Sequence, residues 1–365
     1  MTETGLRTAC HIWHTEHEGR MVDFAGWEMP IQYSTIIHEH EAVRQRAGLF
    51  DVAHMGRLWF SGTDAQAFLS HVLTLNVGNL KTGQVKYGFV LNEHGGILDD
   101  VLLYCLPDQF MLVVNASNRT KILDWLTQHQ SGYAVTIEDK TTSQFMCALQ
   151  GPRALDILQP QTTEILNELA YYHLVETTLF DKPVLLSRTG YTGEDGFEII
   201  LPAEEGLSLW EAIMEAGEQY DILPAGLGCR DTLRLEAAMP LYGHELNEEI
   251  DPITAGLRFG VHLKGTSFIG HEILVERAES PRTVTRVGLV LEGKRIAREG
   301  STLYRDNEQI GEITSGTFAP TLQQSISMAY IRSDVSQPGE QLEVDIRGKR
   351  QPARIVPLPF YKRAQ

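Results

Sequence analysis

Beyond about Thr283 the chain changes from mixed strand and helix patterns to short β-rich runs alone. Six runs follow one another between turn residues: V-T-R-V-G-L-V-L, S-T-L-Y, G-E-I-T-S-G-T, M-A-Y-I, L-E-V-D-I and A-R-I-V. Runs of this length and spacing are typical of an antiparallel barrel or sandwich. The 365 residues also exceed the roughly 250–300 at which one hydrophobic core stops growing. We therefore expect two or three cores, one of them a C-terminal β domain.

The preceding part of the chain mixes strands and helices. Three β-rich runs joined by tight turns predict a meander over Lys86–Ser117, and helical spacing of apolar residues predicts a helix over Asn118–Gln130. The strand patterns Q-F-M-C-A-L-Q, V-L-L-S-R and F-E-I-I-L then alternate with predicted helices at Arg153–Leu158 and Glu205–Ala216. The class expected from these patterns is α+β.

Charge and cysteine usage exclude several classes of protein. The formal net charge of −17 disfavours nucleic-acid and membrane-surface binding, because it repels phosphate backbones and anionic lipids. Every apolar run is shorter than the ~20 residues of a membrane-spanning helix. The four cysteines stand far apart without a C-x-x-C pair, which favours reduced core thiols. With no targeting pattern at the start, we expect a cytoplasmic protein.

The strings that come nearest to nucleotide-binding and metal-binding motifs are incomplete. The string G-L-V-L-E-G-K-R has Arg295 where a phosphate-binding loop needs Ser or Thr, and G-L-G-C-R-D lacks the third glycine of a dinucleotide fingerprint. In the run H-E-H-E, a helix would separate His38 from His40 by ~200°. We therefore predict a solvated helical face at His38–Glu41 and no metal site.

Two adjacent carboxylates interrupt the apolar run I-L-D-D-V-L-L-Y. Because side chains alternate along a strand, Asp99 and Asp100 point to opposite faces, and Asp100 shares its face with Tyr104. A carboxylate among apolar and aromatic groups needs a partner or a function to offset its burial. A turn position for one acid and a salt bridge for the other would explain the pair equally well.

Further candidates stand beside glycine-rich segments. Glu198 follows the loop T-G-Y-T-G-E-D-G, and its alternative is an exposed strand-edge acid. Arg230 falls in the first turn of a predicted helix, where a cation opposes the macrodipole, so it pairs with an acid such as Glu198 or binds a polar ligand. Tyrosines cluster around the same segments and fit a heterocycle pocket or an ordinary core.

These segments together resemble the aminomethyltransferase family, the T-protein of the glycine cleavage system. The matching blocks include M-V-D-F-A-G-W-E-M-P, G-L-F-D-V-A-H-M-G, G-G-I-L-D-D, S-R-T-G-Y-T-G-E-D-G-F-E, P-A-G-L-G-C-R-D-T-L-R-L-E-A, M-P-L-Y-G-H-E-L and G-E-I-T-S-G-T-F-A-P-T-L. They follow the family's order over almost the whole chain, which makes the resemblance specific.

The resemblance implies a three-domain folate-binding fold with ferredoxin-like α+β units and a C-terminal antiparallel β-barrel. We accordingly expect a discontinuous folate-binding α/β-type domain at 1–50 and 141–278, an inserted ferredoxin-like domain at 51–140, and the barrel at 279–365.

The resemblance also implies the reaction. The methylene of an aminomethyl group on the lipoyl arm of H-protein passes to tetrahydrofolate, a co-substrate, and the products are 5,10-methylenetetrahydrofolate, ammonia and dihydrolipoyl H-protein. No metal is expected. The partners implied are lipoylated H-protein and, functionally, glycine decarboxylase P-protein and dihydrolipoamide dehydrogenase.

Site residues carry over from the matching blocks. Asp100 corresponds to the family's key carboxylate near the reacting methylene, where it stabilises developing positive charge and orders the folate nitrogens. Glu198 and Arg230 correspond to pterin contacts. The other expected folate contacts are Tyr87, Tyr104, Asn115, Tyr172, Tyr191, Met55, Tyr242 and Tyr361.

Three related families compete with this interpretation. Sarcosine-type oxidases carry a flavin domain, which finds no match in this sequence. The folate-binding iron–sulfur assembly factor, which is not catalytic, is marked by K-G-C-Y-x-G-Q-E, whereas this chain has T-G-Y-T-G-E-D-G. A folate-dependent demethylase of a small methylated substrate stays open, because it would use the same folate contacts.

Overall fold

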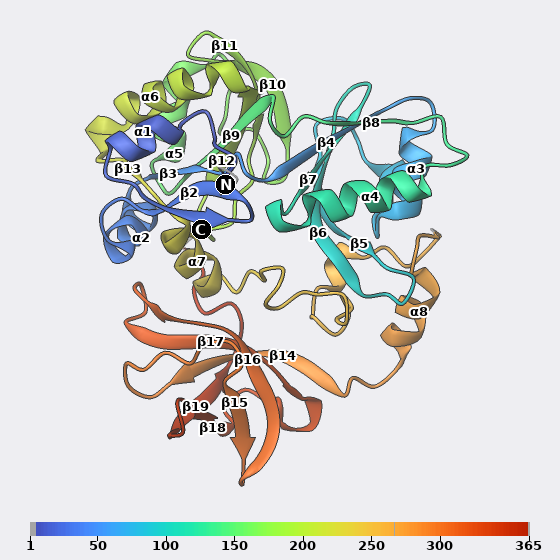
Figure 1. Cartoon of the computed structure of the whole chain (residues 1–365), viewed down its shortest axis with the longest axis vertical. Helices are drawn as coiled ribbons and strands as arrows, with labels where there is room; N and C mark the ends of the chain where they lie inside the picture. The colour runs from blue at the N-terminus through green and yellow to red at the C-terminus, as the bar shows by residue number, and fades with distance from the viewer. Residues whose placement is uncertain (1–4, 266, 364–365) are drawn as a thin grey trace. The chain divides into compact units, whose positions relative to one another are not determined.

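The computed structural model describes residues 5–265 and 267–363, and the chain divides into two compact units. The first unit comprises Met1–Phe68, Gly78–Tyr87 and Val101–Asp231, and the second comprises Leu69–Val77, Gly88–Asp100 and Thr232–Gln365. Figure 1 shows the secondary structure along the chain. The three-domain division expected from the family stays a prediction.

A six-stranded sheet forms the centre of the first unit. Its strand order is β10 (Leu174–Leu179), β11 (Lys182–Ser187), β12 (Gly196–Pro202), β9 (Gln144–Gln150), β3 (Gly48–Asp51) and β13 (Leu223–Pro224). The β3–β13 pair is parallel and the other pairs are antiparallel. Apolar residues fill β9 and β12 almost continuously, as expected of strands covered on both faces.

Helices supply much of the rest of this core. They are α1 (His11–Glu16), α2 (Ile36–Gln45), α5 (Ala154–Leu158) and α6 (Gly206–Gly217). Leu209, Trp210 and Ile213 of α6 pack in the same cluster as β9 and β12. Leu209 and Trp210 stand four and three residues before Ile213, so all three lie on one face of α6, and that face is buried.

A separate two-stranded hairpin precedes α2. Strands β1 (Arg20–Phe24) and β2 (Trp27–Gln32) pair antiparallel, with Ala25 and Gly26 both at positive φ in the turn. Two central residues at positive φ match the twist of the flanking strands, which makes this turn a tight one.

A second sheet has five strands in the order β5 (Val85–Leu91), β6 (Ile97–Cys105), β7 (Phe110–Val114), β4 (Gly56–Ser61) and β8 (Thr136–Asp139). Two helices belong to the same stretch of chain, α3 (Ala65–Val72) and α4 (Arg119–His129). The meander, the helix after it and the α+β class expected from the sequence are confirmed.

The C-terminal strands close into an antiparallel barrel in the order β14 (Val284–Leu291), β17 (Gln324–Arg332), β16 (Glu308–Ala319), β15 (Thr302–Arg305), β18 (Gln341–Asp345) and β19 (Arg350–Val356). On β17, Ala329 and Ile331 belong to one core cluster, while Ile326 and Met328 pack with Leu235. The alternation of a strand thus fills the barrel with one face and covers α7 (Leu227–Glu236) with the other. The last helix, α8 (His271–Glu279), comes before the barrel.

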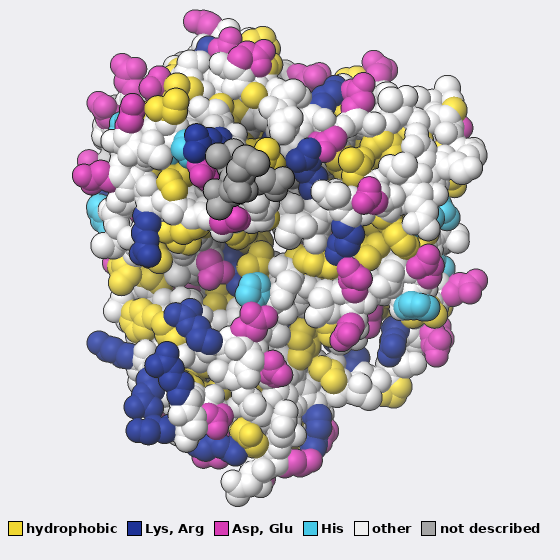
Figure 2. Space-filling model, viewed as in Figure 1, with side chains coloured by type: hydrophobic (Ala, Val, Ile, Leu, Met, Phe, Trp, Pro, Cys, Tyr) yellow, Lys and Arg dark blue, Asp and Glu magenta, His cyan; other side chains and the backbone are white. Residues whose placement is uncertain are grey.

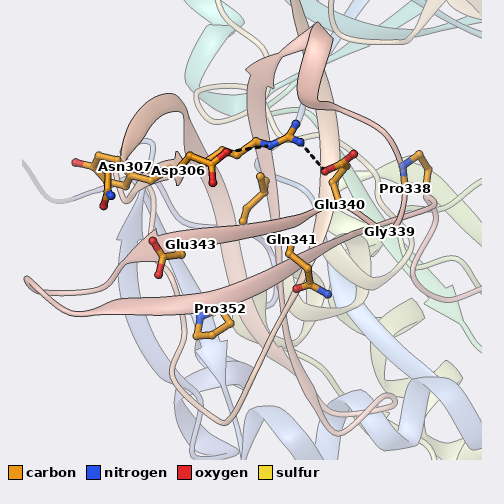
Figure 3. A pocket seen from close by; sticks show the side chains of 11 residues that line it. Asp306, Asn307, Pro338, Gly339, Glu340, Gln341, Glu343 and Pro352 are labelled. Carbon is orange, nitrogen blue, oxygen red and sulfur yellow. Dashed lines mark ion pairs between the residues drawn. The ribbon is translucent and has the colours of Figure 1, made fainter.

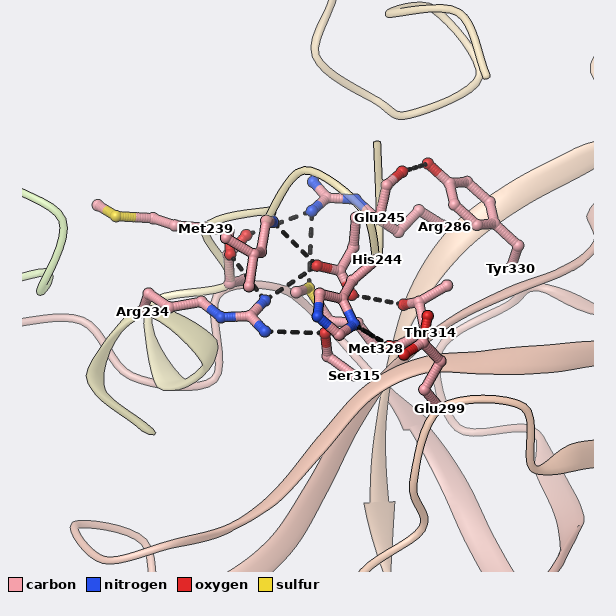
Figure 4. Close-up of polar contacts among 12 residues, drawn as sticks. Arg234, Met239, His244, Glu245, Arg286, Glu299, Thr314, Ser315, Met328 and Tyr330 are labelled. Atoms are coloured by element: carbon pink, nitrogen blue, oxygen red, sulfur yellow. Dashed lines mark hydrogen bonds and ion pairs between the residues drawn. The ribbon is translucent and has the colours of Figure 1, made fainter. Parts of the chain in front are cut away.

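A buried ion pair joins the end of α7 to the barrel. Nη1 of Arg234 lies 2.9 Å from Oε2 of Glu245, and both side chains are almost fully buried. Ser315 accepts from Nη2 of Arg234 at 2.8 Å, and Thr314 donates to Oε1 of Glu245 at 2.5 Å (Figure 4). Both charges therefore have polar partners from β16, as buried charges require.

Of two smaller expectations, one is confirmed and the other is partly wrong. The four cysteines are free and buried, as predicted. The solvated face predicted for His38–Glu41 is wrong for its middle, because Glu39 and His40 are fully buried on α2. Glu39 accepts from the backbone N–H of Tyr33 at 2.7 Å and of Gly226 at 2.9 Å, so its charge is satisfied by loops. None of the helices described is long and apolar enough to cross a bilayer.

Candidate functional site

Glu198 on β12 lies at the centre of a buried polar cluster. Its carboxylate oxygen Oε2 accepts from Thr189 Oγ1 at 2.5 Å and from the Tyr104 hydroxyl at 3.4 Å. Ser187 Oγ lies 2.7 Å from Thr189 Oγ1. No donor among the described residues reaches the other oxygen, Oε1, although Glu198 is only 6% exposed. One oxygen of a fixed carboxylate is therefore left for a ligand N–H.

Tyr104 stays protonated in this cluster. Burial, reinforced by the charge of Glu198, raises the pKa of the Tyr104 phenol well above its usual value. A protonated phenol donates its hydrogen bond to the carboxylate.

The alternative of an exposed strand-edge position for Glu198 is wrong, because β12 pairs with β11 on one side and with β9 on the other.

The glycine-rich loop after β11 is anchored by Gln150 at the end of β9. Nε2 of Gln150 donates to the Thr189 carbonyl at 3.0 Å, and Oε1 accepts from Thr192 Oγ1 at 2.9 Å. A Cβ at Gly190 would lie 2.0 Å from Oε1 of Gln150, and one at Gly196 would lie 2.6 Å from its Nε2. Only glycine leaves room at both positions for this anchor.

A second anchor comes from α2. Nη1 of Arg44 donates to the Thr192 carbonyl at 2.7 Å and lies 2.9 Å from Oε1 of Glu194. Farther along the loop, Arg188 pairs with Asp195 at 2.5 Å. Several side chains thus hold the loop that carries Tyr191 in one conformation.

Arg230 lies against Tyr191. The guanidinium carbon is 4.7 Å from the centre of the Tyr191 ring, a cation–π arrangement. Burial lowers the pKa of Arg230 and the negative charge of Glu198 opposes that effect, which places the two side chains in one electrostatic environment. Nη1 of Arg230 is buried without a hydrogen-bond partner among the described residues. No ion pair joins Arg230 to Glu198 among the described residues, so the choice between pairing with this acid and binding a polar ligand stays a prediction.

The helix start that carries Arg230 is set by Glu39. The Gly226 N–H that donates to Glu39 immediately precedes α7, and the Gly226 carbonyl accepts from the Arg230 N–H at 3.0 Å. A Cβ at Gly226 would lie 2.4 Å from the carbonyl of Ile31. The close approach of two backbones therefore fixes where α7 begins.

Asp100 lies on β6, the strand that also carries Tyr104. Asp99 is 0% exposed, whereas Asp100 is partly exposed. Asp100 and Tyr104 are four residues apart, so they share a face and are separated by ~13 Å along the strand. Asp100 belongs to the second unit, as do Tyr242 and Tyr361.

The other predicted contacts of the first unit fall into two local groups. The Tyr172 carbonyl accepts from the Val85 N–H at 2.8 Å, at the start of the strand that carries Tyr87. The φ of Tyr172 is 60°, which is unfavourable for a residue other than glycine. Such backbone conformations are enriched at functional sites.

Met55 and Asn115 form the second group. Gly56 pairs with Val114 across β4 and β7, so the residues that flank this pair, Met55 and Asn115, lie at the same end of the two strands. Both side chains are partly exposed. These residues stay predicted contacts.

Ser187 and Thr189 of the cluster are absent from the sequence-based prediction, as is the buried His54. The block S-R-T-G contains the first two, yet their role as hydroxyl donors depends on the register between β11 and β12. His54, which is 2% exposed, lies next to Met55 in the block D-V-A-H-M-G. The burial of His54 singles it out in the structure, and the sequence alone does not report that burial.

A cavity of about 680 Å³ lies elsewhere, on the barrel (Figure 3). Its lining includes Tyr304, Arg305, Glu340 and Glu343, with an ion pair of 3.3 Å between Arg305 and Glu340. None of the predicted site residues lines it. Within residues 5–265 and 267–363, no group of three or more His, Cys, Asp or Glu side chains is arranged to hold a metal ion.

Family models and full-length relatives match this chain. The model of the GCVT N-terminal domain matches residues 10–265, and that of the glycine cleavage T-protein C-terminal barrel domain matches residues 285–362. The aminomethyltransferase of Lysinibacillus sphaericus is 42% identical over 367 residues, covering 100% of both chains. That of Rubrobacter xylanophilus is 47% identical over 358 residues, covering 98% of this chain and 94% of the relative.

A solved structure shows the same fold. The crystal structure of glycine cleavage system aminomethyltransferase T from Bartonella henselae matches with a TM-score of 0.92 and 32% identity, over 98% of each chain. Family models, full-length relatives and the fold all agree. The chain therefore belongs to the glycine cleavage T-protein family of aminomethyltransferases.

Proposed function

We propose that this aminomethyltransferase transfers the methylene of an aminomethyl group, carried on the lipoyl arm of H-protein, to tetrahydrofolate with release of ammonia. The observation that carries the proposal is the state of Glu198, whose Oε2 is saturated by hydroxyl donors while Oε1 stays available beside Arg230. The donor edge of a pterin presents N–H groups that such an oxygen accepts.

The remaining groups would give the proposed site its selectivity. The Tyr191 ring and the Arg230 guanidinium contact each other at 4.7 Å, and together they offer an aromatic and cationic surface to a planar heterocycle. Tyr87, Tyr104, Tyr172, Met55 and Asn115 are the proposed further contacts in the first unit. Tyr242 and Tyr361 are proposed from the family resemblance alone.

Asp100 is the proposed catalytic residue. A carboxylate near the reacting carbon stabilises the positive charge that develops as ammonia leaves, and it orders the nitrogens that capture the carbon. The lipoyl group arrives on H-protein and supplies the sulfur that retains the electrons of the broken carbon–sulfur bond. P-protein and dihydrolipoamide dehydrogenase are the proposed functional partners that load and reoxidise that arm.

The decisive experiment measures ammonia release from aminomethyl-lipoyl H-protein with and without tetrahydrofolate. We expect strong stimulation by tetrahydrofolate. Its absence would favour a folate-dependent demethylase or a non-catalytic folate-binding protein.

The variant Asp100→Asn tests the assignment of the acid. It should bind tetrahydrofolate with near-normal affinity yet lose about 10²–10³-fold in turnover, because charge stabilisation is removed while shape is kept. Asp108→Asn, in the exposed turn after β6, is the matched control and should behave as the wild type. Near-normal turnover of Asp100→Asn would contradict the assignment.

A further inference from the structure

Arg188 stands at the base of the glycine-rich loop, directly after β11. It forms a two-bonded ion pair with Asp195, the residue before β12: its Nε donates to Oδ1 at 3.0 Å and its Nη2 donates to Oδ2 at 2.5 Å. A guanidinium and a carboxylate joined by two parallel hydrogen bonds fix each other's orientation as well as their separation. The pair therefore closes the loop 189–194, which carries Tyr191.

The remaining terminal nitrogen of Arg188 reaches a different part of the chain. Its Nη1 donates to the Leu169 carbonyl at 2.8 Å and lies 3.4 Å from the Asn167 carbonyl. Both carbonyls belong to the segment 167–173, which leads into β10 and carries Tyr172. One guanidinium thus bonds to the glycine-rich loop on one side and to the Tyr172 segment on the other, all within the first unit.

The backbone of Arg188 holds Tyr172 as well. The Tyr172 N–H donates to the Arg188 carbonyl at 2.9 Å, and the Arg188 N–H donates to the His173 carbonyl at 2.9 Å. On its other side, the Tyr172 carbonyl accepts from Val85, as described above. A left-handed φ at a tyrosine persists only where the surrounding structure imposes it. Arg188 supplies part of that constraint through its main chain and part through its side chain.

The ion pair of Arg188 and Asp195 is only partly buried. The two side chains are 16% and 27% exposed, and the guanidinium carbon lies 5.7 Å from the centre of the Phe197 ring. A partly exposed ion pair contributes little to the stability of a whole protein. The effect of this pair is therefore local, on the placement of the two segments that it joins.

We propose that Arg188 is a positioning residue for two folate contacts: held by Asp195, it fixes the glycine-rich loop and the segment 167–173 relative to each other, and so places Tyr191 and Tyr172 together for the ligand. The inference rests on the proposed function, in which both tyrosines contact the folate. It gives the arginine and the second acid of the block S-R-T-G-Y-T-G-E-D-G a role that does not require either to touch the folate.

The variant Arg188→Lys separates geometry from charge. It keeps the positive charge, but one ammonium group cannot pair with both oxygens of Asp195 and also reach the Leu169 carbonyl. We expect the Kd for tetrahydrofolate to rise about tenfold with kcat within about threefold, because the binding surface is displaced while the reacting groups are kept. Arg153→Lys, in the exposed pair with Asp156, is the matched control and should bind as the wild type.

Asp195→Asn provides a second variant of the same pair. It keeps the size of the side chain but turns an amide N–H₂ group toward the arginine, so the Kd should rise about three- to tenfold. Thermal midpoints check that each variant folds, and Asp195→Asn carries the test if Arg188→Lys does not. Unchanged folate affinity in the folded variants would overturn the inference.

A double-mutant cycle tests whether Arg188 acts through the two tyrosines. Tyr172→Gly removes one side chain and accepts the left-handed backbone, and Tyr191→Leu removes the other aromatic group. Arg188→Lys should cost only about threefold in Kd in the Tyr172→Gly background and nothing further when both tyrosines are replaced. A tenfold loss that persists in both backgrounds would contradict positioning through these residues.

Hydrogen exchange gives a readout that does not depend on turnover. Without ligand, the amides of residues 167–174 should exchange faster in Arg188→Lys than in the wild type or Arg153→Lys, and saturating tetrahydrofolate should reduce the difference. Equal exchange in all three proteins would defeat the positioning role alone. A wild type without folate-stimulated ammonia release would instead defeat the proposed function, so the two failures are distinguishable.

Discussion

The two carboxylate oxygens of Glu198 do different work. Oε2 is held by Thr189 and Tyr104, while Oε1 is left for a ligand. An acid fixed in this way is preorganised, so ligand binding does not have to order it. The affinity of the site for its ligand then depends more on the charge of Glu198 than on the shape of its side chain.

The variant Glu198→Gln tests that dependence. It keeps the size of the side chain but replaces a charged acceptor by a neutral one, so the dissociation constant for tetrahydrofolate should rise about 10–100-fold. Equilibrium binding measures the effect. Glu176→Gln, at an exposed position of β10, is the control, and similar affinities for the two variants would contradict the role of Glu198.

At the residue scale the sequence could predict what the family blocks carry, and little else. Asp100, Glu198 and Arg230 stand in specific blocks. The role of Glu39 depends on its burial and on backbone N–H groups that distant segments bring to it, and no local sequence pattern reports these. Glu39 even reads as solvated, because its partner N–H groups come from loops as remote as Gly226.

At the scale of elements, α1 is tied to the central sheet through Asp51 at the end of β3. Oδ2 of Asp51 accepts from Thr8 Oγ1 at 2.6 Å and lies 2.9 Å from Nε2 of His14. Tyr33 contacts the other ring nitrogen of His14 at 2.8 Å. Burial raises the pKa of Asp51, but the contacts with His14, Thr8 and the Ala53 N–H outweigh it, so the net pKa lies below the usual value.

That direction predicts a pH dependence. A lowered folded-state pKa stabilises the protein above the unfolded pKa of about 3.9, and the contribution is lost as pH falls through the folded pKa. Asp51→Asn should therefore lose roughly 2–4 kcal/mol in urea unfolding at pH 5–7, with a smaller loss below pH ~3.9. Glu16→Gln, exposed on α1, is the control. A penalty that does not change with pH would argue against a charged Asp51.

The ion pair between Arg234 and Glu245 makes a second prediction at this scale. Arg234→Met alone should cost roughly 3–5 kcal/mol, since it leaves Glu245 charged and buried, whereas Arg234→Met with Glu245→Leu should recover much of that loss. Urea unfolding measures both. Asp334→Asn, in an exposed pair with Arg332, should leave the stability nearly unchanged. A double variant as unstable as the single one would contradict the argument.

Elements were more predictable than residues for a physical reason. The β-rich runs of the barrel and the meander alternate or repeat over many positions, so each prediction rests on several side chains at once. The order of strands within each sheet rests on long-range pairing, such as β3 between β9 and β13, which local patterns do not encode.

At the scale of the whole molecule, charge is unevenly divided along the sequence. Residues 1–280 carry 18 basic and 39 acidic side chains, a net charge of −21, whereas residues 281–365 carry 13 basic and 9 acidic ones, a net charge of +4. Figure 2 shows Lys and Arg side chains gathered over the barrel. The net charge of −17 therefore hides a basic region suited to an acidic protein partner.

If the proposed partner H-protein docks through this basic region, its binding should weaken with salt. Between roughly 0.02 and 0.3 M salt, the KM for H-protein should rise about five- to tenfold, while the KM for tetrahydrofolate changes less. Steady-state kinetics at several salt concentrations measure both constants. A KM for H-protein that is insensitive to salt would mean that docking does not use this charge.

The anchor between Gln150 and its two glycines limits how this chain can change over time. A side chain at Gly190 or Gly196 collides with the amide that holds the loop, and shortening Gln150 to make room removes the bonds to Thr189 and Thr192. Each single substitution is therefore harmful, and a tolerated path must alter these positions together. We expect them to vary jointly among descendants of this sequence, although none of the three is proposed to touch the folate.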